Sequence, residues 1–348
     1  MQMAAGPHLK SKGAHFMKAI VKARQAGRIR IEEKELPQLG DGEVLVEVSY
    51  CGVCGSDIHA AKHAKGYEFV GTGTTLGHEI SGKVINVSGD ENAHLLNKHV
   101  VIESMHYCGS CENCREGRTS VCHEINVIGL HFDGGMAQYV KVKPKFIQEL
   151  PPQLPVDMAA LLEPMSIAVH SVKKIKEIMP QDNILIQGPG IIGFFTGLIC
   201  SDKKAEVRIS GLERDYNYRL SKAYLFNMKP FIADKEELPD KVDYVFECSG
   251  SSAALKSSFR YLRKGGQLVA VALYEQETAL FLTEMVRNEW PILTSYGCDP
   301  EDYRDAADLL IKYQSQLRNI VSYFPLIEAE RAFTESMNQK VLKAVLYN

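Results

Sequence analysis

The chain has 348 residues, with 40 Lys or Arg against 43 Asp or Glu, so its formal net charge is −3. This near balance argues against a broad surface for nucleic acid or anionic membranes, and 45% hydrophobic residues are typical of a folded rather than a disordered chain. No apolar run approaches the roughly 18–20 residues of a membrane-spanning helix, and the length predicts two domains.

The first 16 residues mix Gly, Pro, Lys and His without periodicity and lack the apolar stretch of a secretory signal. We expect residues 1–16 to be a disordered or added leader ahead of a natural start at Met17, and the alternative that they are native stays open. The nine cysteines include four within fifteen positions. This clustering indicates a reducing, cytoplasmic setting in which cysteines hold metal rather than form disulfides.

The region from Met17 to about Val142 is predicted to be all-β. Short alternating runs separated by Gly, Asp and Asn turns are typical of strands, as in EVLVEVSY (43–50), ISGKVINVSG (80–89) and KHVVIES (98–104).

Two motifs in this β-rich region offer ligands for a metal ion, CGVCGSDIH at 51–59 and LGHEISGKV at 76–84. A thiolate, an imidazole and a carboxylate can share one zinc ion while leaving a position open for substrate. The candidate ligands are Cys54, His78 and either Glu79 or Glu163. We expect Asp57 to orient His78 from behind.

Four further cysteines follow the pattern C-x2-C-x2-C-x7-C, namely Cys108, Cys111, Cys114 and Cys122. Four thiolates without another ligand type favour tetrahedral zinc in a closed, structural site. An iron–sulfur cluster is the alternative, but the chain has no second cysteine cluster. We therefore expect two zinc ions per chain, one catalytic and one structural.

The segment 158–175 is predicted to be a helix that Pro164 ends or kinks. The next segment, 183–215, has the pattern of a buried strand, a glycine turn, a helix and a second buried strand. Buried strands at 241–250 and 265–273, with a helix at 251–264 between them, extend this pattern of a parallel sheet. A helix at 299–316 and a strand at 341–348 complete the chain.

The glycine turn reads G-x-G-x-x-G and consists of Gly188, Pro189, Gly190, Ile191, Ile192 and Gly193. Because it follows a strand and opens a helix, it predicts a dinucleotide site whose pyrophosphate lies at the helix N-terminus. Glu213, at the end of the second strand, could bind the ribose hydroxyls and favours NAD. Arg214 could instead meet a 2′-phosphate, so NADP remains an alternative.

Together and in this order, the motifs resemble those of the zinc-dependent medium-chain dehydrogenase/reductase family, on the branch of sorbitol (polyol) and threonine 3-dehydrogenases. The resemblance covers about residues 17–348. The segments that carry it are 51–59, 77–79, the four cysteines, G-G-M-A-Q-Y at 134–139, L-E-P at 162–164, 188–193 and E-C-S-G at 247–250.

The resemblance implies an α/β protein with a GroES-like β-rich catalytic domain at 17–165 and 300–348. It also implies a Rossmann cofactor domain, a doubly wound parallel sheet, at 166–299. The family's catalytic residues match Ser56 and His59 as a proton relay, with Asp57 beside them. Ser249 falls among the cofactor-binding residues, whereas Gly211 stands where the family usually has the acid that binds ribose.

The implied activity is hydride transfer between NAD(P) and a secondary alcohol, such as a polyol, a sugar alcohol or its phosphate. The alternatives are a threonine 3-dehydrogenase-like or aminocyclitol dehydrogenase, and a non-catalytic zinc and NAD-binding redox sensor. The family also implies a homodimer or homotetramer.

Overall fold

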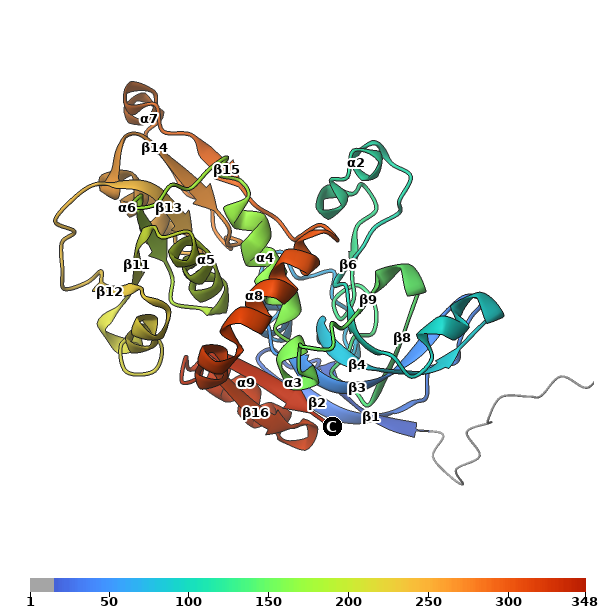
Figure 1. The fold of residues 1–348 in the computed structure, drawn as a ribbon. Helices are drawn as coiled ribbons and strands as arrows, with labels where there is room; N and C mark the ends of the chain where they lie inside the picture. Colours follow the sequence, from blue (N-terminus) through green and yellow to red (C-terminus); the bar gives the residue numbers. More distant parts are fainter. Residues whose placement is uncertain (1–15) are drawn as a thin grey trace, which may run out of the picture.

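The computed structural model describes residues 16–348. A largely antiparallel sheet of seven strands joins the N-terminal part of the chain to its C-terminus (Figure 1). Its strands are β16 (Val321–Pro325), β17 (Lys343–Tyr347), β3 (Val44–Gly52), β4 (Glu79–Val87), β5 (His99–Ile102) and β9 (Ile147–Glu149) in this order, with β8 (Tyr139–Val142) also on β3. Two antiparallel pairs accompany it, β1 (Phe16–Lys22) with β2 (Ile29–Glu35) and β6 (Met105–His106) with β7 (Asn126–Val127).

The second sheet is parallel and has six strands. In spatial order they are β12 (Lys229–Ile232), β11 (Glu206–Gly211), β10 (Asn183–Gln187), β13 (Val242–Glu247), β14 (Leu262–Ala270) and β15 (Ile292–Thr294). The chain runs outward on one side of β10 and then on the other, so the strand order reverses between β10 and β13. In doubly wound sheets a ligand crevice opens at this point, beyond the carboxyl ends of the strands.

The α-helices are α1 (Gly55–Ala61), α2 (Glu112–Arg115), α3 (Val156–Ala159), α4 (Leu162–Val172), α5 (Ile191–Asp202), α6 (Ser252–Tyr261), α7 (Leu282–Asn288), α8 (Asp302–Leu317) and α9 (Ala329–Met337). Helices α4 and α8 lie between the two sheets, and the segment around α2 projects as a small lobe (Figure 1). Apolar side chains of α4 and α8 share one buried core with the parallel sheet and α5. This shared core joins the two parts of the molecule.

The predicted fold class, including the parallel sheet with its glycine turn, is confirmed, but two local expectations need correction and the end of the expected leader shifts by one residue. The region 17–142 is not all-β, because α1 and α2 interrupt it. Pro164 neither ends nor kinks a helix: α3 stops at Ala159, and Pro164 lies in the first turn of α4, where its missing N–H has no helical partner to lose. The expected leader lies outside the described residues, except for Phe16, which opens β1.

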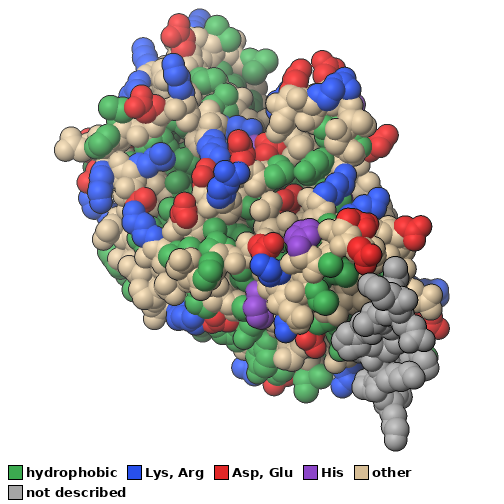
Figure 2. Space-filling view, turned by 45° about the vertical axis from the view of Figure 1, so that its right-hand side comes forward, with side chains coloured by type: hydrophobic (Ala, Val, Ile, Leu, Met, Phe, Trp, Pro, Cys, Tyr) green, Lys and Arg blue, Asp and Glu red, His purple; other side chains and the backbone are tan. Residues whose placement is uncertain are grey.

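No helix within residues 16–348 combines the length and apolar character needed to cross a membrane. On the face drawn in Figure 2, basic and acidic side chains are interspersed.

Candidate active site and metal centres

The buried carboxylate of Asp57 joins the two ligand-bearing motifs. Cys54 precedes the first residue of α1, and its backbone N–H donates to Oδ2 of Asp57 over 2.9 Å. Oδ1 of Asp57 accepts from the backbone N–H of Gly77 over 3.0 Å. Burial raises the pKa of Asp57, partly offset by the charge of His78. Asp57 thus fixes the start of α1 against the segment that carries His78.

His78 lies at the centre of the site and is almost fully buried. Its Nε2 is 3.1 Å from Oγ of Ser56, and its Nδ1 is 3.7 Å from Oδ1 of Asp57. Burial alone lowers the pKa of His78, but the charges of Asp57 and Cys54 outweigh it, so the pKa is raised well above its usual range. Ligand atoms of Cys54, His78 and Glu79 all lie within 4.8 Å of one another.

Glu79 forms a fully buried ion pair with Lys343 of β17. Neither of its oxygens receives an aligned hydrogen bond from the described residues, so the ion pair is its main polar contact. Gly52 makes room for this carboxylate, because a Cβ at Gly52 would stand 1.8 Å from Oε2 of Glu79. Nζ of Lys343 also donates to the carbonyl oxygen of Val53 over 3.0 Å.

Glu163 reaches the same region from the first turn of α4. Its Oε1 accepts a hydrogen bond from Oγ of Ser104 over 2.7 Å. Burial raises its pKa to about 7, with opposing effects from the charges of His78 and Glu79. In this region, the ligand atoms that lie within 4.8 Å of one another belong to Cys54, His78 and Glu79. Glu163 is not part of this group.

The site has the composition of a zinc centre. Sulfur, imidazole nitrogen and carboxylate oxygen are the ligands that catalytic zinc takes in proteins. Several acidic groups are buried around His78, and among the described residues Lys343 forms an ion pair with one of them, Glu79. A divalent cation would compensate this excess of buried negative charge.

The four clustered cysteines also have the geometry of a metal site. All four sulfur atoms lie within 4.8 Å of one another, and Sγ is 3.9 Å from Sγ in both the Cys108–Cys114 and Cys111–Cys122 pairs. Tetrahedral zinc with Zn–S bonds of about 2.3 Å separates its sulfurs by about 3.8 Å. Backbone N–H donors, first that of Ser110, lower the pKa of Cys108 to about 6, which favours the thiolate that metals bind.

The three glycines of the glycine turn differ in their surroundings. Gly188 has φ of +104° and packs against Ser249, so a side chain would be both strained and crowded. A Cβ at Gly190 would meet nothing within 4 Å, which leaves space for a ligand beside the N-terminus of α5. A Cβ at Gly193 would stand 2.1 Å from the carbonyl oxygen of Gly188, so strand and helix pack closely there. Ile191 and Ile192 open α5. This geometry fits a dinucleotide pyrophosphate.

Beyond β11, Glu213 and Arg214 are both exposed. Oε2 of Glu213 is 3.1 Å from Nζ of Lys235, whereas no ion pair or side-chain hydrogen bond engages Arg214 among the described residues. Gly211 at the end of β11 supplies no side chain toward a ribose. Arg214 is therefore unpaired among the described residues, whereas one carboxylate oxygen of Glu213 is paired with Lys235.

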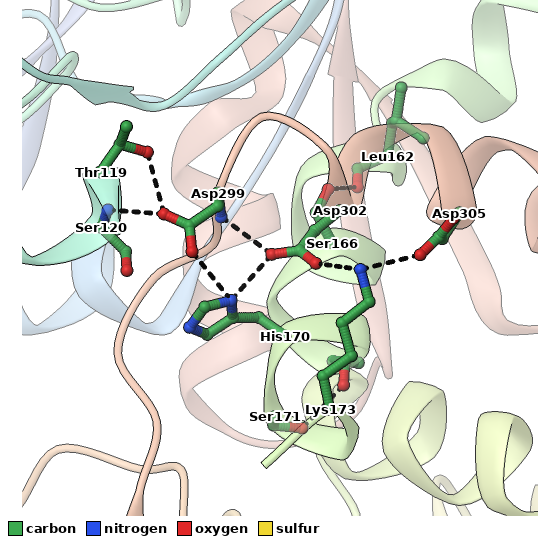
Figure 3. Close-up of polar contacts among 11 residues, drawn as sticks. Thr119, Ser120, Leu162, Ser166, His170, Ser171, Lys173, Asp299, Asp302 and Asp305 are labelled. Atoms are coloured by element: carbon green, nitrogen blue, oxygen red, sulfur yellow. Dashed lines mark hydrogen bonds and ion pairs between the residues drawn. The ribbon is translucent and has the colours of Figure 1, made fainter. Parts of the chain in front are cut away.

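A third group of His and Asp residues, which the sequence did not reveal, joins the cysteine lobe to α4 and α8 (Figure 3). Nδ1 of His170 is 2.8 Å from Oδ2 of Asp302, and Lys173 pairs with the other oxygen of Asp302 over 2.7 Å. Oδ1 of Asp299 accepts from Oγ1 of Thr119 and the backbone N–H of Ser120 over 2.9 and 2.8 Å. Because Lys173 already supplies a cation, this group is an ion-pair network rather than a metal site.

Sequence reasoning also missed Lys343 and Glu275. Lys343 stands within the apolar run VLKAVLYN, where a lone lysine on a buried strand is the signal that could have identified it. Glu275 lies in an exposed loop after β14, with Oε1 2.7 Å from Nδ1 of His59. No sequence pattern marks it.

Comparisons with known proteins agree with this geometry. Residues 40–152 match the model of the alcohol dehydrogenase GroES-like domain, and residues 213–312 match that of the zinc-binding dehydrogenases. The chain is 31% identical to a D-arabitol-phosphate dehydrogenase of Enterococcus avium over 89% of this chain and 91% of that protein. It is 30% identical to a sorbitol dehydrogenase of Halalkalibacterium halodurans over 95% and 99% of the two chains. A Sinorhizobium meliloti protein solved with NADP bound superposes with a TM-score of 0.85 at 25% identity, over 96% and 99% of the two chains.

Proposed function

The chain belongs to the family of zinc-binding, medium-chain alcohol dehydrogenases, and on this premise we propose that it is a zinc-dependent dehydrogenase of polyol-type secondary alcohols. It would transfer a hydride between such an alcohol, free or phosphorylated, and NAD(P). The observation that carries the proposal is the gathering of Cys54, His78 and Glu79 within 4.8 Å, with the hydroxyl of Ser56 3.1 Å from His78.

Cys54, His78 and one carboxylate would hold the catalytic zinc, and we propose Glu79 as that carboxylate, with Glu163 as a second acid beside it. The four cysteines would hold the structural zinc. When bound, the catalytic zinc supplies Lewis acidity to the alcohol oxygen, and the nicotinamide supplies the hydride acceptor. The glycine turn, Gly188–Gly193, would bind the pyrophosphate, with Ser249 against it.

The chain's own residues would then move the proton. Ser56 accepts the proton of the substrate hydroxyl through Oγ and passes its own toward His59. The two side chains are three positions apart on α1 and therefore share a helix face. His59 is partly exposed, so it can release the proton to water. Asp57 holds the start of α1 in place throughout this transfer.

The names of the two similar curated proteins, a D-arabitol-phosphate dehydrogenase and a sorbitol dehydrogenase, support a sugar alcohol or its phosphate as substrate. We keep NAD as the preferred cofactor, with NADP as the alternative that the exposed Arg214 supports. A threonine 3-dehydrogenase-like or aminocyclitol substrate and a sensor without turnover are the outcomes that the test below separates.

We also propose a homodimer or homotetramer in the cytoplasm. Strand β15 is an edge of the parallel sheet, and the adjacent α7 segment exposes Phe281, Leu282 and Val286. An open edge flanked by apolar side chains favours pairing with a second copy. None of the nine cysteines is joined in a disulfide, which supports a reducing compartment. The proposed domain limits remain 17–165 with 300–348, and 166–299.

The test is absorbance of NAD(P)H with a panel of polyols, polyol phosphates, aminocyclitols and β-hydroxy amino acids, combined with metal analysis of the same sample. We expect two zinc ions per chain and turnover of a polyol or its phosphate. Binding of NAD(H) without turnover of any alcohol would favour the sensor, and a single zinc confined to the four cysteines would refute the catalytic centre.

A further inference from the structure

The imidazole of His59 is in contact with a carboxylate from the opposite part of the molecule. His59 is on α1, beside the metal-binding motifs, whereas Glu275 is in the loop that follows β14 of the parallel sheet. Nδ1 of His59 is 2.7 Å from Oε1 of Glu275. This nitrogen is buried and has no aligned hydrogen bond with the described residues, so the close approach of the Glu275 carboxylate is its main polar contact.

An aromatic contact also fixes the orientation of the His59 ring. The ring stacks on Tyr67 with the ring centroids 5.4 Å apart and 15° between the planes. Burial raises the pKa of Tyr67, with additional effects from the charges of Cys54, Tyr296, Asp57 and Glu275. Tyr67 therefore stays neutral, and Glu275 supplies the carboxylate in contact with His59.

The loop that carries Glu275 is anchored by a buried carboxylate. The hydroxyl of Tyr274 donates to Oε2 of Glu247, which lies fully buried at the end of β13. Glu247 also accepts from the backbone N–H groups of Ser249 over 2.8 Å and Gly250 over 3.2 Å. The turn that follows β13 therefore holds the loop of Glu275 and also packs against the glycines of the candidate cofactor site. The position of Glu275 is thus fixed relative to that site.

We propose that Glu275 is a positioning residue for the proton relay, which rests on the proposed function. Its carboxylate, with Oε1 2.7 Å from Nδ1, favours the tautomer of His59 that carries the proton on Nδ1, and Nε2 is then free to take the proton that arrives through Ser56. The proton bonded to Nε2 leaves to water, and the Nδ1–H bond is unchanged over the cycle. A base oriented by a third group is the arrangement by which enzymes fix the tautomer of a histidine. Because Glu275 and His59 come from the two sides of the site, the relay is complete only when these sides are together.

The kinetic test compares E275A with E277A, a matched variant of an exposed glutamate two positions along the same loop. We expect E275A to lower kcat for alcohol oxidation about tenfold, as outer positioning groups commonly do, with the KM for NAD(P) unchanged. The pH dependence of kcat should also differ from that of wild type in E275A and match it in E277A. In an H59Q background the E275A change should have no further effect. The proposal would be overturned if E275A left kcat unchanged or raised only KM. It would also be overturned if E275A lowered kcat by the same factor in the H59Q background as in wild type.

A second readout does not depend on turnover. The 15N spectrum of histidine-labelled protein, with His59 assigned by its absence in H59Q, reports which ring nitrogen carries the proton. We expect the Nδ1–H form in the zinc-loaded protein and its loss in E275A but not in E277A. An identical spectrum in E275A overturns the positioning role even if the enzyme is active. If no alcohol is oxidised, the proposed function fails, and the spectrum still decides the role of Glu275.

Discussion

Lys343 of the last strand and Glu79 of β4 form a buried ion pair directly beside Cys54 and His78, although 264 positions separate the two residues in the chain. Burial lowers the pKa of Lys343, but the charge of Glu79 outweighs this effect and raises it overall. Strand β17 therefore supplies the positive charge that compensates Glu79 beside the candidate metal site.

Replacing Lys343 by methionine should destabilise the metal-free protein by about 3–5 kcal/mol, because Glu79 would remain as a buried, uncompensated carboxylate. Zinc should recover part of this loss, since it supplies positive charge at the same place. Urea unfolding of K343M with and without zinc measures both effects. The control is K340M at a nearby exposed lysine, which should change the free energy of unfolding by less than about 0.5 kcal/mol. Equal stability of K343M and wild type without zinc would contradict the role of the pair.

Gly52 should be required for metal binding. A Cβ there would overlap Oε2 of Glu79 at 1.8 Å and crowd Cε of Lys343 at 3.0 Å. G52A should therefore displace the carboxylate and weaken zinc binding at the catalytic site about tenfold or more. A Cβ at Gly55 would meet nothing within 4 Å, so G55A is the matched control. Competition with a chelator gives the affinities, and similar values for both variants would show that Glu79 is not confined by Gly52.

The sequence allowed some of this architecture to be predicted, because some of it is local. The glycine turn and the four cysteines are short-range patterns whose spacing alone determines their geometry, and Cys54 and His78 lie in two recognisable motifs. The pairing of Glu79 with Lys343 depends on β17 lying beside β3, and no local pattern fixes that long-range register. The role of Glu275 could not be predicted for the same reason, since its partner His59 is on the opposite side of the site.

The two metal sites should be separable by mutation. C54S should remove one zinc ion per chain and abolish turnover, because the proposed thiolate ligand is lost, while NADH binding is retained. C108S should remove the other zinc ion and leave Cys54 and His78 in place. Elemental analysis, kinetics and NADH fluorescence distinguish the two variants. Full activity of C54S after loss of its zinc would exclude this site from the chemistry.

Glu103 should make stability depend on pH. Burial raises its pKa from 4.5 to about 7, partly offset by a hydrogen bond from Gln148. The folded state therefore holds this proton more tightly than the unfolded state, so stability falls as pH rises from about 4.5 to about 7 and is then level. E103Q keeps the hydrogen bond without the charge and should be more stable than wild type at pH 8 by up to about 3 kcal/mol, but not at pH 4. Denaturant midpoints across this range measure the difference. E149Q, at an exposed glutamate on β9, should show no such trend.

Asp299 should hold the cysteine lobe against the body of the protein. Its Oδ1 accepts from Thr119 and from the backbone of Ser120, shortly before Cys122, and its Oδ2 is 3.6 Å from Nδ1 of His170 on α4. D299A leaves two donors without their acceptor, which costs about 1–3 kcal/mol. Because D299A leaves the proposed zinc ligands in place, this loss should appear as local opening and not as global unfolding. Hydrogen exchange of residues 108–122 should become faster in D299A at unchanged zinc content.

D305A, which removes only the exposed partner of Lys173, should leave that exchange unchanged. Equal exchange in D299A and wild type would mean that the metal alone fixes the lobe.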